Sequence, residues 1–196
     1  MDYGLDMLAG YWIAVDSGGR AYVYREVYES GLIISRAAEA IRAMTKEEVY
    51  CYLAPPDMWS RQKDTGKTMA EIFMLCGVPI VRADNNRVQG HLQVHEALAD
   101  MPDGKPGLLF FNNCKETAAD IEDIQADERN PNDCAKEPHE ITHTVDSVRY
   151  YCVSRTMRAD ARDANPSEII YEDEDAQEDY EEFMTGDAPS AGYISY

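Results

Sequence analysis

Two β-rich runs joined by a short turn stand near the start of the chain and limit how it can fold. Residues 10–15 (GYWIAV) and 21–28 (AYVYREVY) are rich in β-branched and aromatic side chains, and Asp16-Ser17-Gly18-Gly19 separates them. Such residues favour strands, and a short glycine-containing segment between two strands is typical of a hairpin. We therefore expect an antiparallel strand pair in this region.

After the hairpin, short apolar runs alternate with helical patterns. The predicted strands cover residues 49–53, 79–82 and 107–111, and the predicted helices cover 37–44, 67–75, 87–98, 118–124 and 145–157. Ser35 is expected to be the N-cap of the first helix, and Asp146 is expected to open the last. Strands that alternate with helices form sheets covered by helices. We predict an α/β fold, a mixed β-sheet flanked by helices.

The charge of the chain is strongly negative and unevenly distributed. Lys and Arg number 18 against 37 Asp and Glu, and residues 159–196 alone hold twelve acidic residues and one basic residue. We predict a domain at 1–158 followed by a disordered acidic tail at 159–196. The net charge of −19 argues against nucleic-acid binding by charge alone and against anionic membranes. A nuclease stays open, because bound metal ions would supply local positive charge.

Cysteine spacing and hydropathy bear on where the protein is found. The chain has five cysteines, Cys51, Cys76, Cys114, Cys134 and Cys152. Because they form no CxxC pair, we expect reduced thiols of a cytosolic protein and no zinc knuckle. His91 and His95 stand four residues apart and are expected to be exposed on a helix. No apolar run reaches transmembrane length, so a soluble protein without a membrane partner is expected.

A second histidine pair matches a zinc-peptidase motif. His139-Glu140-Ile141-Thr142-His143 has the H-E-x-x-H spacing, which on a helix would place both imidazoles on one face, with Glu140 as general base. Asp146 is a conceivable third ligand. Pro138 and the neighbouring threonines argue against a helix at this point.

Three carboxylates stand where a sheet would bring them together. Asp2 is near the start of the chain, Asp57 follows the predicted strand 49–53, and Asp146 lies in the last helix. Sites in α/β proteins assemble at the carboxyl ends of strands. Carboxylate oxygens are hard ligands suited to Mg²⁺ or Mn²⁺.

From Asp2 to about Arg155, the sequence resembles the nuclease domain of tailed-phage terminase large subunits, the DNA-packaging motors. The resemblance rests on the order and spacing of several short segments: DYG at 2–4, GYWIAVD at 10–16, YREVY at 24–28, APPDMW at 54–59, NRVQG at 86–90 and HTVDSVRY at 143–150.

The resemblance implies a ribonuclease-H-like fold whose site binds two divalent metal ions, Mg²⁺ or Mn²⁺. By position the ligands would be Asp2, bridging both ions, with Asp57 and Asp146 each holding one. His143 corresponds to a neighbour of the last acid in the motif, and Asp6 would be an auxiliary ligand. The implied chemistry is phosphodiester hydrolysis by in-line displacement.

Family resemblance also implies partners and a location. Double-stranded DNA would be contacted mainly at its phosphates, for which the candidate residues are Arg61, Lys63, Lys67 and Arg87. A terminase ATPase domain, a small terminase subunit and a portal would be further partners, in the cytoplasm of the bacterial host. Since only Met1 precedes Asp2, we expect a nuclease domain detached from its ATPase domain.

Three functions are compatible with these patterns. The first is a metal-dependent endonuclease that cleaves concatemeric phage DNA. The second is a zinc peptidase acting through His139, Glu140 and His143. The third is an inactive domain that serves as an interaction module.

Overall fold

The computed structural model describes residues 1–4, 6–61 and 66–160, and within these ranges leaves aside the side chains of 139, 140 and 156–160. Met1–Ala159 form one compact unit. The predicted acidic tail falls almost wholly outside the described residues. In the part of the chain that is described, no helix is both long enough and apolar enough to cross a membrane.

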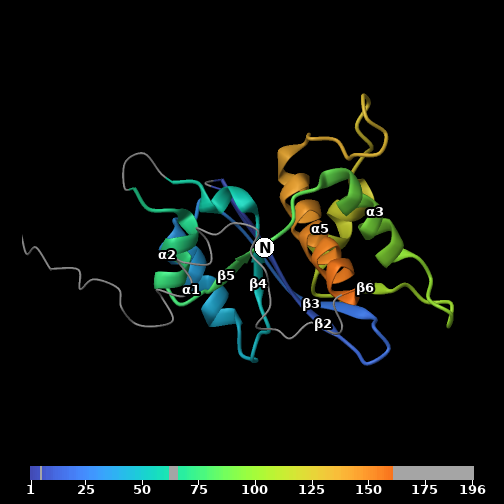
Figure 1. Ribbon diagram of the computed structural model, residues 1–196, viewed down its shortest axis with the longest axis horizontal. Helices are drawn as coiled ribbons and strands as arrows, with labels where there is room; N and C mark the ends of the chain where they lie inside the picture. The colour runs from blue at the N-terminus through green and yellow to red at the C-terminus, as the bar shows by residue number, and fades with distance from the viewer. Residues whose placement is uncertain (5, 62–65, 161–196) are drawn as a thin grey trace, which may run out of the picture. The chain divides into compact units, whose positions relative to one another are not determined.

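The larger sheet has four strands, in the order β1-β2-β3-β6 (Figure 1). The strands are β1 (Asp2–Tyr3), β2 (Met7–Val15), β3 (Ala21–Ser30) and β6 (Leu108–Phe110). β1, β2 and β3 pair antiparallel, and β6 pairs parallel with β3. The predicted hairpin is therefore present, with both of its strands longer than expected.

A second, parallel pair consists of β4 (Tyr52–Ala54) and β5 (Ile80–Arg82). The Met1 ammonium group donates a hydrogen bond of 2.7 Å to the carbonyl oxygen of Leu53 in β4. Since Asp2 follows in β1, this contact brings the two sheets together at β1 and β4.

A β-bulge allows strand β3 to contribute side chains to two separate hydrophobic cores. Trp12 pairs with Arg25 and Ile13 with Val23, so β3 has one extra residue, Tyr24, at this point. A bulge reverses which alternate side chains face each side of a strand. As a result Val27 packs in one core and Val23 in the other.

Helices pack against both cores. The first core is lined by α1 (Ile34–Met44), α2 (Met69–Leu75) and the 3₁₀ helix η1 (Pro56–Trp59), and the second by α3 (Arg87–Leu98), α4 (Lys115–Asp123) and α5 (His139–Asp160). Figure 1 shows α1 and α2 on one side of the strands and α3 and α5 on the other. The predicted mixed sheet flanked by helices is confirmed.

Two expectations about helix starts are wrong. α1 begins at Ile34 with Ile33 as N-cap and no side-chain cap, so Ser35 lies inside the helix. α5 begins at His139 rather than near 145, so Asp146 lies two turns inside it. Proline is tolerated at the start of a helix, and burial of Thr142 and Thr144 outweighs their weak helix propensity.

The ion pair between Arg25 and Glu47 predicts a pH-dependent contribution to stability. Its N–O distance is 2.7 Å, and the hydrogen bonds from Arg25 lower the pKa of Glu47 from 4.5 to about 2. Because the folded-state pKa lies below the unfolded value, this contribution is present above pH 4.5 and is lost as the pH falls toward 2. Urea unfolding measures the difference in unfolding free energy between the parent and Glu47→Gln. We expect this difference to be smaller at pH 3 than at pH 7. An unchanged difference would contradict this role.

Candidate functional site

Three sequence-distant carboxylates lie near enough to Tyr150 of α5 for their charges to act on its phenol. Asp2 comes from β1, Asp57 from η1 directly after β4, and Asp146 from α5, one turn before the tyrosine. Burial raises the pKa of the Tyr150 phenol, and the charges of Asp2, Asp146 and Asp57 raise it further. The charges of all three acids that the sequence analysis singled out therefore act on the same phenol.

Asp57 is the acid most open to solvent. The residue as a whole is exposed, but protein atoms crowd its carboxyl group. This partial desolvation, followed by the negative charge of Asp2, raises the pKa of Asp57. Among the described residues it has no ion-pair partner. Asp2 and Asp57 thus form a repelling pair whose charge an added cation would offset.

His143 of α5 bridges two carboxylates at the start of the chain. Its Nδ1 lies 2.6 Å from Oδ2 of Asp2, and its Nε2 lies 3.3 Å from Oδ2 of Asp6. The hydrogen bond with Asp2 is the main cause that raises the pKa of His143 to about 9. Both ring nitrogens of His143 therefore face carboxylates in the metal-free chain.

Gly4 makes the approach of these side chains possible. A Cβ at this position would lie 2.5 Å from Oδ1 of Asp6 and 3.4 Å from Cε1 of His143. Any larger residue would push Asp6 away from the imidazole. The glycine of the DYG segment thus has a steric reason to be there.

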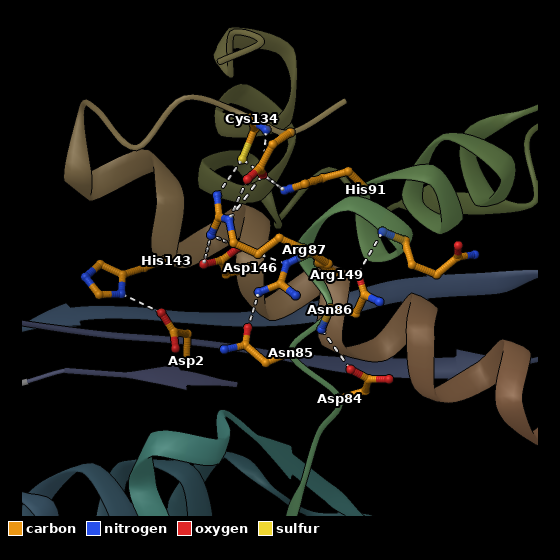
Figure 2. A network of polar contacts seen from close by, with 12 residues as sticks. Asp2, Asp84, Asn85, Asn86, Arg87, His91, Cys134, His143, Asp146 and Arg149 are labelled. Carbon is orange, nitrogen blue, oxygen red and sulfur yellow. Dashed lines mark hydrogen bonds and ion pairs between the residues drawn. The ribbon is translucent and has the colours of Figure 1, made fainter. Parts of the chain in front are cut away.

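Asp146 is held by two arginines (Figure 2). Arg87 Nη1 lies 3.3 and 3.1 Å from its two carboxylate oxygens, and Arg149 Nε lies 3.0 Å from Oδ1. Arg149 is fully buried and also donates to Asn85. A Cβ on Gly90 of α3 would lie 2.5 Å from Arg149 Cγ, so only glycine allows α3 to pack this closely on the arginine.

The four expected DNA-contacting residues have different surroundings. Arg87 differs most from the expectation, because its guanidinium donates to Asp133 and Asp146 inside the protein rather than facing solvent. Arg61 and Lys67 are exposed beside η1, and Lys63 lies outside the described residues.

A second polar cluster was missed by the sequence analysis. The donor atoms of His91, Asp133 and Cys134 all lie within 4.8 Å of one another. His91 is 8% exposed, so the expectation of an exposed histidine is wrong, whereas His95 is exposed as expected. No local spacing could have revealed the cluster, because 42 residues separate His91 from Asp133. None of the five cysteines, all of which the structure describes, forms a disulfide bond.

Solved structures with a similar fold are large terminases of bacteriophages and their nuclease domains. The nuclease domain of the P22 large terminase matches with a TM-score of 0.61 and 18% identity, over 79% of this chain and 78% of that one. The large terminase of the thermophilic bacteriophage D6E matches with a TM-score of 0.56 and 18% identity, over 80% of this chain. This chain spans only 38% of the D6E protein.

A third structure, the large terminase nuclease domain of bacteriophage SPP1 with bound Mn, has a TM-score of 0.56 and 19% identity. The match covers 79% of this chain and 83% of that one. No protein-family model and no curated protein sequence matches the chain. The structural matches confirm the predicted ribonuclease-H-like fold, which this chain shares with terminase nuclease domains.

Proposed function

We propose that this chain is the nuclease domain of a phage DNA-packaging terminase, a divalent-metal-dependent endonuclease that cleaves concatemeric double-stranded DNA. The observation that carries the proposal is that Asp2, Asp57 and Asp146, from three separate elements, all lie near enough to Tyr150 for their charges to raise the pKa of its phenol. The fold shared with terminase nuclease domains, one of them solved with Mn, supports it.

The acidic residues fit Mg²⁺ or Mn²⁺. Their donors are carboxylate oxygens, the ligands that both ions prefer, and the repulsion between Asp2 and Asp57 is what a divalent cation would relieve. Asp2 would lie between two ions, with Asp57 on one and Asp146 on the other. Bound ions of this kind would activate the attacking water and stabilise the leaving 3′-oxygen.

The surrounding residues would orient these ligands. His143 hydrogen-bonds to Asp2 and thereby fixes one carboxylate oxygen, while Asp6 holds the other side of the imidazole. Arg87 and Arg149 do the same for Asp146. Ligands held in place by hydrogen bonds pay less entropy when a metal binds.

Substrate contacts would come from the exposed bases near η1. Arg61 and Lys67 are the described candidates for phosphate contacts, with Lys63 between them in sequence. In a packaging motor the chain would act with a terminase ATPase domain, a small terminase subunit and a portal, in the cytoplasm of the bacterial host.

The zinc-peptidase alternative receives mixed support from the geometry. His139-Glu140-x-x-His143 does lie on a helix, α5, but both ring nitrogens of His143 face carboxylates, those of Asp2 and Asp6. Since a zinc ligand must present a lone pair, His143 would have to give up one of these contacts to serve the motif. The side chains of His139 and Glu140 lie outside the description.

Supercoiled plasmid incubated with the purified chain and Mn²⁺ or Mg²⁺ tests the proposal. We expect nicking followed by linearisation, lost on addition of EDTA and absent in Asp146→Ala. Glu140→Gln should cleave like the parent, because that carboxylate serves only the peptidase motif. If the folded parent chain cleaves with neither metal, the interaction-module alternative replaces the nuclease.

A further inference from the structure

The cluster of His91, Asp133 and Cys134 has the dimensions of a metal site. His91 Nε2 lies 3.1 Å from Cys134 Sγ and 3.2 Å from Asp133 Oδ1. Zinc bond lengths of about 2.0–2.3 Å in tetrahedral geometry require donors roughly 3.3–3.6 Å apart. The two distances from His91 are within a few tenths of an ångström of this range, and the donors of Asp133 and Cys134 lie within 4.8 Å of each other, so small adjustments of the loop would admit the ion.

Two ordered segments present these donors. His91 lies inside α3, and Asp133 and Cys134 belong to a loop closed by backbone hydrogen bonds. The amide of Asp127 donates to the carbonyl of Asp133, and that of Ala135 donates to the carbonyl of Gln125. Because the loop is already closed on itself, a metal would join two preformed segments, the usual design of a structural site.

Metal binding would change the chemical state of the thiol. On coordination the proton of the Cys134 thiol would leave to solvent and the sulfur would bind as thiolate.

Arg87 has the position of an outer-shell partner to these ligands. Its Nε lies 3.1 Å from both carboxylate oxygens of Asp133, and its Nη2 lies 3.3 Å from Cys134 Sγ. N–H groups that donate to ligand oxygens and sulfurs orient them and offset their negative charge. Figure 2 shows this guanidinium between the cluster and Asp146.

We propose that His91, Asp133 and Cys134 bind a zinc ion, at a site separate from the acidic site around Tyr150. One imidazole, one thiolate and one carboxylate are a ligand set selective for Zn²⁺ over Mg²⁺, the reverse of the all-carboxylate site. The ion would anchor the loop to α3 and hold Arg87 against Asp146. This inference does not depend on the nuclease activity.

Cobalt substitution in the full chain tests the site. Co²⁺ bound to a thiolate gives a near-ultraviolet charge-transfer absorption that carboxylate-bound Co²⁺ does not give. We expect this absorption to saturate at one Co²⁺ per chain and to disappear when Zn²⁺ is added. Cys134→Ser and His91→Gln should each abolish it.

Matched variants separate this site from others. Cys76→Ser, at a more accessible thiol, and Asp57→Asn, in the acidic site, should both keep the absorption. Far-ultraviolet circular dichroism identifies any variant that has failed to fold, in which case Asp133→Asn, expected to weaken Co²⁺ binding at least tenfold, decides. No thiolate absorption in the folded parent, or an absorption that survives Cys134→Ser, would overturn the proposal, whatever the plasmid assay shows.

Discussion

Asp57→Asn should abolish metal-dependent cleavage while leaving the metal-free chain at least as stable as the parent. The variant removes a ligand from the proposed site, and a bound metal supplies several kcal/mol of transition-state stabilisation. At about 1.4 kcal/mol for each factor of ten, the rate should fall roughly a thousandfold or more. The same change removes a carboxylate whose pKa is raised by desolvation and then by the charge of Asp2, so we expect no loss of folding stability.

Plasmid cleavage in Mn²⁺ measures the activity of the variant, and thermal unfolding in EDTA measures the stability of its metal-free form. Asp123→Asn is the matched control, because it makes the same chemical change at an exposed residue at the end of α4. The control should cleave and unfold like the parent. If Asp57→Asn still cleaves DNA at a rate within tenfold of the parent, Asp57 is not a metal ligand. The proposal that Asp57 and Asp146 each hold one ion would then be wrong.

Arg149→Met should cost about 3–5 kcal/mol of stability, the penalty for removing one partner of a buried ion pair. Arg149 is fully buried, donates to Asp146 at 3.0 Å and to Asn85 at 2.9 Å, and lies over the Tyr150 ring. Methionine fills much of the space but donates no hydrogen bond. Asp146, whose side chain is only 16% exposed, would lose one of its two arginine partners in a place where water replaces it poorly, whereas the exposed Asn85 could be hydrated.

Denaturant unfolding in EDTA measures this difference without any metal contribution. Arg36→Met is the control, because the Arg36 side chain is 68% exposed and pairs with Glu39 on the surface of α1. An exposed pair contributes about 0–1 kcal/mol, so the control should stay close to the parent. A loss below about 1 kcal/mol in Arg149→Met would mean that the arginine is not needed to hold α5 and α3 together.

The local sequence predicted the order and type of the elements well. α3 spans Arg87–Leu98, the predicted range, although the apolar Val88 and Leu92 are exposed and Gly90, His91 and Val94 are buried instead. The hairpin turn lies at Asp16–Gly19. The bounds of a helix and the position of a turn depend on neighbouring residues, such as the Asn86 N-cap and the glycines of the turn. Such requirements can be read along the chain without knowing what packs against it.

The metal-binding role of the candidate acids could not be predicted from local sequence patterns. Nothing in the composition distinguishes Asp2, Asp57 and Asp146 among 37 acidic residues. Only the resemblance to terminase nuclease domains selected them, and only the fold brings them to a common neighbour, Tyr150. The sequence carried the order of the acids but not the distances on which metal binding depends.

Tertiary structure alone decided the pairings between distant residues. The bulge at Tyr24 determines which side chains of β3 enter each core, and the packing of α3 on α5 places Arg87 against Asp146 and His91 against Cys134. Local periodicity identifies candidate apolar positions but not which distant segment packs against a residue. That packing is set by how distant segments close on one another, so the expected exposure of His91 could be corrected only by the folded chain.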